Sequence, residues 1–352
     1  MTFYGGFTKN AVRENEPLKE EREMASRWNA RGEPLFTVIV PVYNVAPFLE
    51  KSLLSLLEQA GEDVQVLLVD DGSTDESGAL CDAYAPRFPW GEALHQQNSG
   101  VAAARNAGLR RARGEYLLWL DPDDWVLPGW MQGIREEIEA HRPDMLIFDY
   151  AKCYGRQQQV CLYGRPAGRL SAGQVLLDLT EDHRLTSVLW NKVIHRRFFA
   201  ARAFDETLRC LEDYDLLYRM VMEMENIRYR PGVLYAYRIR DDGLVRAPDL
   251  NIGYQSFQQA QMRYKAVRSA GKEASVLGTV LQAKGFCCKY YQSGMPGAYK
   301  AQYRACCRHL RRSLRAVIRA EGLGLKDKMK YALIPWRGVG LCYALAKKLK
   351  RK

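Results

Sequence analysis

The stretch FTVIVPVYN, residues 36–44, decides the fold. Its β-branched run over 36–40, closed by Pro41, predicts a short buried strand. Pro47 then stands where a first helical turn would begin, and leucines at helical spacing follow it up to Leu57. This region is therefore predicted to form a strand, a turn and a helix.

The same alternation repeats further along the chain. Apolar runs at 64–69 and 116–120 predict two more buried strands, and the small-residue segment 101–112 predicts a helix between them. Ser73 and Glu76 have the spacing of a capping box that would open another helix. Strands that alternate with helices indicate an α/β fold with an open, mostly parallel sheet flanked by helices.

Each predicted strand runs into polar residues. The three strand ends read Pro41-Val42-Tyr43-Asn44, Asp70-Asp71-Gly72-Ser73 and Asp121-Pro122-Asp123-Asp124. Ligands of open α/β sheets bind beyond the carboxyl ends of the strands. We therefore expect a binding site at this edge of the sheet.

The cluster Asp121, Asp123 and Asp124 brings three carboxylates together after an apolar strand. Such carboxylates repel one another unless a cation sits among them, and a hard divalent ion shared with a diphosphate would serve. The alternative is a polar turn whose aspartates cap the next helix.

Two other acidic positions have both a functional and a structural interpretation. Asp71 stands where it can accept hydrogen bonds from a nucleobase, but Asp-Gly is also a common turn. Glu212 and Asp213 open a predicted helix, where carboxylates commonly interact with the helix dipole. Their functional interpretation is a general base that takes the proton of an attacking hydroxyl.

Five segments in a fixed order carry a family resemblance: TVIVPVYN, LLVDDGSTD, NSGVAAARNAG, YLLWLDPDDW and LEDYDL. This order resembles family 2 of the inverting glycosyltransferases, closely over residues 36–126 and, through WNKVIHRRFF and YAYRIR, more distantly to Arg240. The resemblance implies the Rossmann-like GT-A fold. It also implies transfer of a hexosyl or N-acetylhexosaminyl group from a nucleotide sugar, expected to be a UDP-sugar, to an acceptor hydroxyl with inversion. The context it implies is synthesis of a cell-surface polysaccharide: capsule, exopolysaccharide or lipopolysaccharide.

The resemblance also assigns roles by position. It places Pro41 and Tyr43 beside the base, Asp71 against a uracil-type base, Asp123 near the ribose, and Arg105 and Asn106 as donor-site supports. It makes Asp124 the main ligand of Mn²⁺ or Mg²⁺, with Asp123 beside it and Asp121 as the outer member of the acidic cluster. Asp213 matches the catalytic base. Pro122 departs from the Ser or Thr that is frequent in the family.

The basic residues are concentrated at one end of the chain. The net charge is +11, and residues 301–352 hold 15 Lys or Arg and 2 acids. Cations beside apolar and aromatic groups there suit a helix that lies on an anionic membrane surface. The alternative is a helix packed on the catalytic domain with a solvated basic face. Membrane attachment fits a carbohydrate acceptor that carries a lipid.

We predict three parts: a charged extension over 1–34, a GT-A catalytic domain over 35–240 and a basic helical region over 241–352. No signal peptide and no uninterrupted apolar run long enough to span a bilayer is visible, so we expect a cytoplasmic protein, peripheral on the inner face of the cell membrane. The rival classes are a nucleic-acid-binding protein that uses the basic tail and an inactive scaffold of the same fold. No nucleic-acid-binding motif supports the first, and the intact acidic positions oppose the second.

Overall fold

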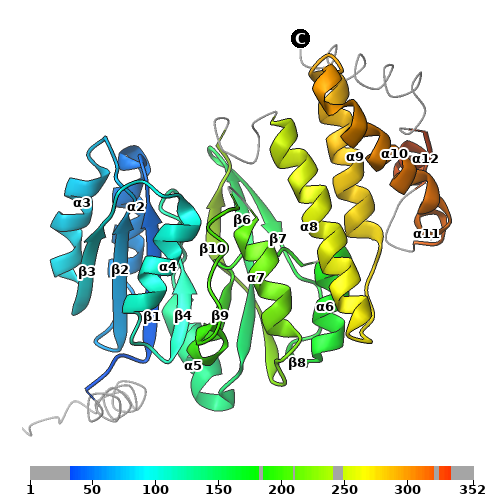
Figure 1. The fold of residues 1–352 in the computed structure, drawn as a ribbon. Coiled ribbons are helices and arrows are strands. Elements are labelled where there is room, and N and C mark those ends of the chain that lie inside the picture. The colour runs from blue at the N-terminus through cyan, green and yellow to red at the C-terminus, as the bar shows by residue number, and fades with distance from the viewer. Residues whose placement is uncertain (1–31, 182–184, 209–210, 241–248, 321–324, 334–352) are drawn as a thin grey trace, which may run out of the picture.

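The computed structural model describes residues 32–181, 185–208, 211–240, 249–320 and 325–333. Its centre is one mixed sheet of ten strands (Figure 1). Four parallel strands form the first half in the order β3 (Trp90–His95), β2 (Val64–Asp70), β1 (Phe36–Val42), β4 (Tyr116–Trp119). The carboxyl ends of these strands therefore lie at one edge of the sheet.

The second half of the sheet combines both strand directions. It continues from β4 through β9 (Lys192–His195), β6 (Met145–Tyr154), β10 (Ile227–Arg238) and β5 (Trp125–Val126), with β7 (Gln157–Cys161) on β6 and β8 (Gly168–Leu170) on β10. Strands β6 and β10 are parallel to each other, and the other pairs in this half are antiparallel. The predicted α/β fold is thus confirmed, but the sheet is mixed rather than mostly parallel, because apart from β6 and β10 its parallel pairs are confined to the first half.

Helices cover both faces of the sheet. Helices α2 (Ala46–Leu57), α3 (Ser77–Tyr84) and α5 (Trp130–His141) share one apolar cluster with Val38 and Val40 of β1. Helices α4 (Val101–Arg111), α6 (Ala172–Glu181) and α7 (Glu212–Val221) share the other with Ile39. Alternate residues of β1 thus point to opposite faces, as the pleat of a strand requires.

Helix α4 is rich in small residues because it lies close to β1. A Cβ atom added at Gly108 would come within 2.5 Å of Cγ2 of Ile39. This close approach holds the helix that carries Arg105 and Asn106 against the centre of the sheet.

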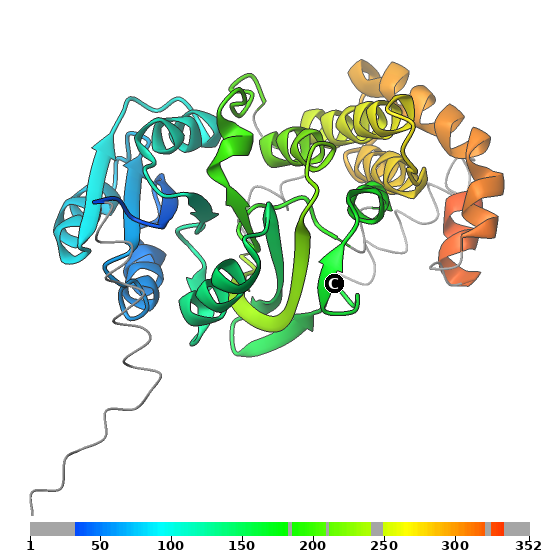
Figure 2. The same cartoon turned by 90° about the horizontal axis from the view of Figure 1, so that it is seen from below.

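The C-terminal part of the described chain is helical, as predicted. Helices α8 (Leu250–Ser269), α9 (Leu277–Gln292), α10 (Lys300–Arg312), α11 (Leu314–Arg319) and α12 (Leu325–Leu333) follow the last strand, and α8 and α9 pack on α6 (Figures 1 and 2). They form a third apolar cluster, in which α10 buries Tyr303, Cys306, Cys307 and Leu310. Within the described ranges, no helix combines the length and the apolar character needed to cross a bilayer.

The capping box predicted at Ser73 and Glu76 is wrong. Helix α3 begins at Ser77 without a side-chain cap from Glu76, and Ser73 Oγ instead accepts a hydrogen bond from the Asn44 amide at 3.1 Å. Asp75 accepts from the amides of Ser77 at 2.9 Å and Ala46 at 3.1 Å. One carboxylate therefore holds the starts of two helices.

Candidate active site

The strand ends that the sequence singled out do meet at one edge. The Asp71 amide donates to the Val42 carbonyl at 2.8 Å, which joins the loops that follow β2 and β1. Pro41 is buried within β1, whereas the Tyr43 side chain beyond the strand is 46% exposed. Tyr43 is thus accessible to a ligand at this edge.

Asp71 holds the loop that leads into α4. Its Oδ1 accepts from Gln96 Nε2 at 2.7 Å and from the Ser99 amide at 2.9 Å, and its Oδ2 accepts from the Gly100 amide at 2.7 Å. Asp71 is buried, and these three bonds fix the start of α4 relative to β2. Any contact of Asp71 with a nucleobase would add to this structural role.

Asp124 turns into the protein. It is fully buried, its Oδ2 accepts from the Tyr235 hydroxyl at 2.8 Å, and its Oδ1 accepts from the Arg238 amide at 2.7 Å. Burial, followed by the charges of Asp121 and Asp123, raises the pKa of Asp124 well above its ordinary value. Asp124 thus ties the acidic turn to β10, and both of its oxygens already have partners.

Asp121 and Asp123 remain accessible, because each side chain is 26% exposed. Asp121 pairs with Arg105 at 3.4 Å and Asp123 pairs with Arg240 at 3.3 Å. Burial raises the pKa of Asp121 to about 6, with Arg105 acting in the opposite direction. The repulsion expected from the sequence is therefore relieved here by arginines of the chain itself.

Arg105 connects the acidic turn to the start of α7. Its guanidinium pairs with Glu212 and with Asp121, and it is buried together with Glu212. Burial alone would lower the pKa of Arg105, but the carboxylates of Glu212, Asp121 and Asp213 outweigh it and raise that pKa. A permanent cation thus lies among the carboxylates of two distant segments.

Asp213 has the acid-base property expected of a general base. Burial and then the Glu212 charge raise its pKa, Arg105 lowers it, and the net result is a pKa of about 7. A carboxylate with that pKa exchanges a proton near neutral pH, where a base works best. Its Oδ1 accepts from the Tyr214 amide at 2.9 Å.

Lys192 was not assigned a role from the sequence. It is 1% exposed, and its Nζ donates to the carbonyls of Thr186 at 2.8 Å and Val188 at 2.6 Å and to Asn191 Oδ1 at 2.6 Å. Burial lowers its pKa to about 7, while the charge of Asp213 acts in the opposite direction. Lys192 therefore holds the turn before β9 close to the candidate base.

Asn106 supports the site from behind. Its Nδ2 donates to the Phe204 carbonyl at 2.9 Å and to Glu206 Oε1 at 2.8 Å, and its Oδ1 accepts from the Phe204 amide at 2.9 Å. All of its polar atoms are engaged within the protein, so it fixes the segment before α7.

Aromatic and cationic side chains of β10 complete the edge. Tyr235 and Tyr237 both stack on Trp190, with ring centroids 4.5 Å and 5.4 Å apart. The Arg238 guanidinium lies over the rings of Phe48 and Trp125, each at 4.9 Å. The alternation in YAYRIR was the available sequence signal, because residues two apart on a strand share a face.

Asp124, which the sequence predicts to be the main metal ligand, is fully buried with both carboxylate oxygens bonded within the protein. In the part of the chain that the structure describes, no three His, Cys, Asp or Glu side chains form a ready-made ligand group. Magnesium and similar ions are commonly held by one or two carboxylates together with substrate phosphates. Asp123 and Asp121, which are partly exposed, fit that requirement, whereas the buried Asp124 does not.

A comparison with protein families identifies the domain that contains this edge. Residues 37–202 match the family model described as Glycosyl transferase family 2. Over these residues the chain thus resembles a glycosyltransferase of family 2. The matched range includes the positions from Pro41 to Asp124, and Asp213 follows it.

Similar curated proteins carry related names. The chain is 33% identical over 225 residues to glycosyltransferase EpsJ of Bacillus subtilis, 30% identical over 218 residues to glycosyltransferase GlyA of Streptococcus pneumoniae, and 30% identical over 213 residues to the minor teichoic acid biosynthesis protein GgaB of Bacillus subtilis. These matches cover 61%, 60% and 59% of this chain. They cover 64%, 31% and 23% of the relatives, which is less than two thirds of each.

A solved structure supports the fold assignment. Residues 1–349 of S. aureus TarS, in complex with UDP-GlcNAc, superpose with a TM-score of 0.63 at 18% sequence identity, covering 88% of this chain and 92% of that one. The GT-A fold predicted from the sequence is thereby confirmed, including its helical C-terminal region.

Proposed function

We propose that this chain transfers a sugar from a nucleoside diphosphate sugar to an acceptor hydroxyl, with inversion, in the synthesis of a cell-surface polysaccharide. The observation that carries the proposal is Asp213. This carboxylate opens α7 next to the Arg105–Glu212 pair, and its pKa lies at about 7. The match of residues 37–202 to the family 2 model supports a donor site at the same edge.

In the proposed reaction, Asp213 takes the proton of the acceptor hydroxyl. The freed oxygen pair forms a bond to the anomeric carbon as the bond from that carbon to the diphosphate breaks. The leaving diphosphate departs with the electron pair, and attack from the opposite face inverts the centre. Arg105 keeps the Asp213 carboxylate oriented through its pair with Glu212 and offsets the local negative charge.

We assign the donor to the edge formed by β1, β2 and β4. Pro41 and Tyr43 border the base, Asp71 faces a uracil-type base while it holds its loop, and Asp123 lies near the ribose. Arg105 and Asn106 support this site from α4. A UDP-sugar with a hexosyl or N-acetylhexosaminyl group is the donor we expect, and the UDP-GlcNAc complex of the TarS neighbour supports this choice.

A divalent cation, Mn²⁺ or Mg²⁺, is part of the proposal. Such an ion neutralises charge on a departing diphosphate. Asp123 would be its main protein ligand, with Asp121 beside it, because these two side chains are partly exposed. The neighbouring Asp124 orients the turn that presents them.

We propose a carbohydrate acceptor, lipid-linked in the simplest case, and a location on the cytoplasmic face of a membrane. The exposed arginines of α10 and α11 support electrostatic attraction to anionic lipid. The apolar face of α10 does not serve insertion, because Tyr303, Cys306, Cys307 and Leu310 pack within the helical region. Trp336, Leu341 and Leu345 are among the apolar and aromatic groups of residues 301–352, and they lie outside the described residues.

The direct test is Asp213→Asn with Asp215→Asn as a matched control on the same helix. Loss of a general base typically costs a factor of about 10² to 10⁴ in turnover. We expect that loss of turnover for Asp213→Asn, while UDP binding, measured by calorimetry, stays near normal. The control should show little change in turnover. Product with a retained anomeric configuration, determined by NMR, would contradict the mechanism.

A further inference from the structure

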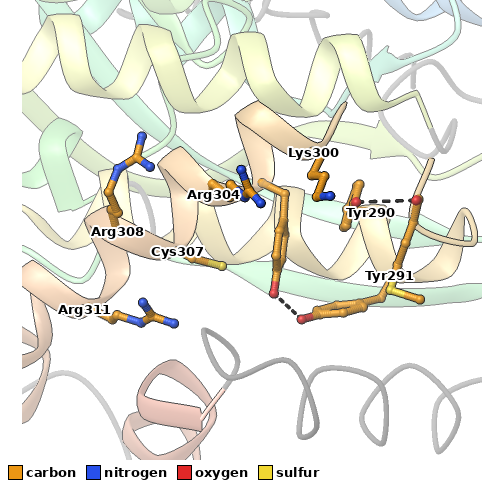
Figure 3. Close-up of a pocket in the computed structure, with 9 residues that line it drawn as sticks. Tyr290, Tyr291, Lys300, Arg304, Cys307, Arg308 and Arg311 are labelled. Carbon is orange, nitrogen blue, oxygen red and sulfur yellow. Dashed lines mark hydrogen bonds between the residues drawn. The ribbon is translucent and has the colours of Figure 1, made fainter. Parts of the chain in front are cut away.

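A cavity lies far along the chain from the catalytic edge, between α9 and α10. It has a volume of about 300 Å³ and is lined mainly by tyrosines of α9 and α10 and by cations of α10 (Figure 3). None of the donor or catalytic positions discussed above lines it. A ligand held here would therefore be bound separately from the sugar nucleotide.

The floor of this cavity is a cluster of buried tyrosines. Tyr290 stacks on Tyr303 with ring centroids 4.6 Å apart, and the hydroxyls of Tyr291 and Tyr303 are hydrogen-bonded to each other. All three tyrosines are at most 8% exposed. Burial raises the pKa of Tyr303, so its hydroxyl adds no negative charge beside the cations.

The rim consists of cations on one side of α10. Lys300, Arg304 and Arg308 follow one another at intervals of four residues, and Arg311 completes the rim; all four side chains are exposed. No aspartate or glutamate occurs anywhere between positions 274 and 320. In the described part of the chain, Lys300, Arg304 and Arg308 have no acidic partner.

This arrangement works against the stability of the helix that carries it. Like charges four residues apart repel each other, and a cation in the first turn opposes the helix dipole. Lys300 is the first residue of α10, and the first turn contains no acid. The cationic rim is thus poorly explained as a stabilising feature, and it matches the needs of an anionic ligand.

We propose that this cavity binds a phosphate ester, with the phosphate oxygens on Arg304 and Arg308 and the organic part of the ester against the tyrosine floor. Guanidinium groups match phosphate oxygens with paired, charge-assisted hydrogen bonds. A phosphate presents several oxygens and close to two charges at neutral pH, which suits several neighbouring cations. The ester belongs either to a lipid headgroup or to a soluble phosphorylated molecule.

The test compares two double variants of the full chain that remove the same charge. Arg304→Gln with Arg308→Gln changes the rim, and Arg315→Gln with Arg319→Gln removes two exposed arginines of α11 at the same spacing, outside the cavity. Binding of inorganic pyrophosphate is measured by calorimetry in the presence of a chelator. We expect the rim variant to bind about tenfold more weakly or worse, and the control variant to bind like the parent.

A vesicle assay separates the two sources of the ester. Phosphatidylcholine vesicles carry either phosphatidic acid or an equal charge of phosphatidylglycerol. Loss of a preference for phosphatidic acid in the rim variant alone indicates a headgroup, whereas an unchanged vesicle preference with weakened pyrophosphate binding indicates a soluble ester. Equal weakening of pyrophosphate binding in both variants, or no binding by the parent chain, overturns the proposal.

The folded state is checked in the same samples. Because both substitutions relieve repulsion between exposed like charges, the Tm of either variant should equal or slightly exceed that of the parent. No step of this test involves turnover, so its result stands apart from that of the Asp213 experiment.

Discussion

The substitution Glu212→Gln tests the electrostatic argument for the catalytic base. Glu212 is buried beside Asp213 and pairs with Arg105. Its charge is the second largest cause, after burial, that raises the pKa of Asp213 to about 7. The base acts in its deprotonated form, so kcat/KM should fall as the pH drops below about 7 in the parent enzyme.

Removal of the Glu212 charge lowers the pKa of Asp213. A like charge at short range shifts a carboxyl pKa by about 1 to 3 units. Because burial is the larger cause here, we expect the acidic limb to move by about 1 unit toward lower pH, equivalent to about 1.4 kcal/mol. At pH 6 the deprotonated fraction of Asp213 would then rise from about one tenth to about one half.

The assay is kcat/KM for sugar transfer across pH 5 to 9, within the range that both proteins tolerate. Asp215→Asn is the control, because Asp215 lies on the same helix turn but pairs with Arg219. The Tm of Glu212→Gln should fall, since it leaves the buried Arg105 with a weaker partner. An acidic limb that stays in place or moves to higher pH would refute the assignment of Asp213 as the base that Glu212 tunes.

Three further outcomes are expected. Asp123→Asn should raise the Mn²⁺ concentration needed for half-maximal activity by about tenfold or more, whereas Asp124→Asn should mainly lower Tm. Full activity of the parent enzyme in a chelator would contradict the metal proposal. Substitution of Arg312, Arg315 and Arg319 by Gln should weaken the binding free energy for anionic liposomes, measured by sedimentation, by up to about 1 kcal/mol per residue and leave binding to neutral liposomes unaffected. Unchanged and salt-insensitive binding would contradict membrane attachment through these arginines. Gly108→Ala should lower the free energy of unfolding by about 1–3 kcal/mol in denaturant titration, because the added Cβ would meet Ile39 at 2.5 Å. This loss is expected although alanine is the better helix former. Equal stability would show that α4 moves away from β1 at little cost.

The strands that could be predicted are those with a clear hydrophobic pattern in the sequence. Strands β1, β2 and β4 are buried along their whole length, so an apolar run marks each of them. Strand β3 is half-buried at the sheet edge, and its sequence WGEALH has no such run. Strand β10 has an uninterrupted strand-like sequence only over 233–238, because Pro231 and Gly232 precede that run where the register to β6 shifts.

The candidate site was predictable in position but not in orientation. The carboxylates that follow the predicted parallel strands were expected at one edge of the sheet, and they lie there in the structure. The three aspartates after β4 look equivalent in the sequence, yet Asp124 turns inward because its partner Tyr235 lies 111 residues further along. The pairing of Arg105 with Glu212 spans 107 residues and leaves no local pattern.

The shared hydroxyl of Tyr235 has an evolutionary consequence. It donates to Asp124 and accepts from the Asp121 amide at 3.1 Å, so a single oxygen serves both ends of the acidic turn. A change to phenylalanine would leave a buried carboxylate with one partner fewer, at a cost of about 1–3 kcal/mol or more for a charged group. Positions 124 and 235 should therefore covary among relatives, and lineages that lose the hydroxyl should also have replaced the carboxylate.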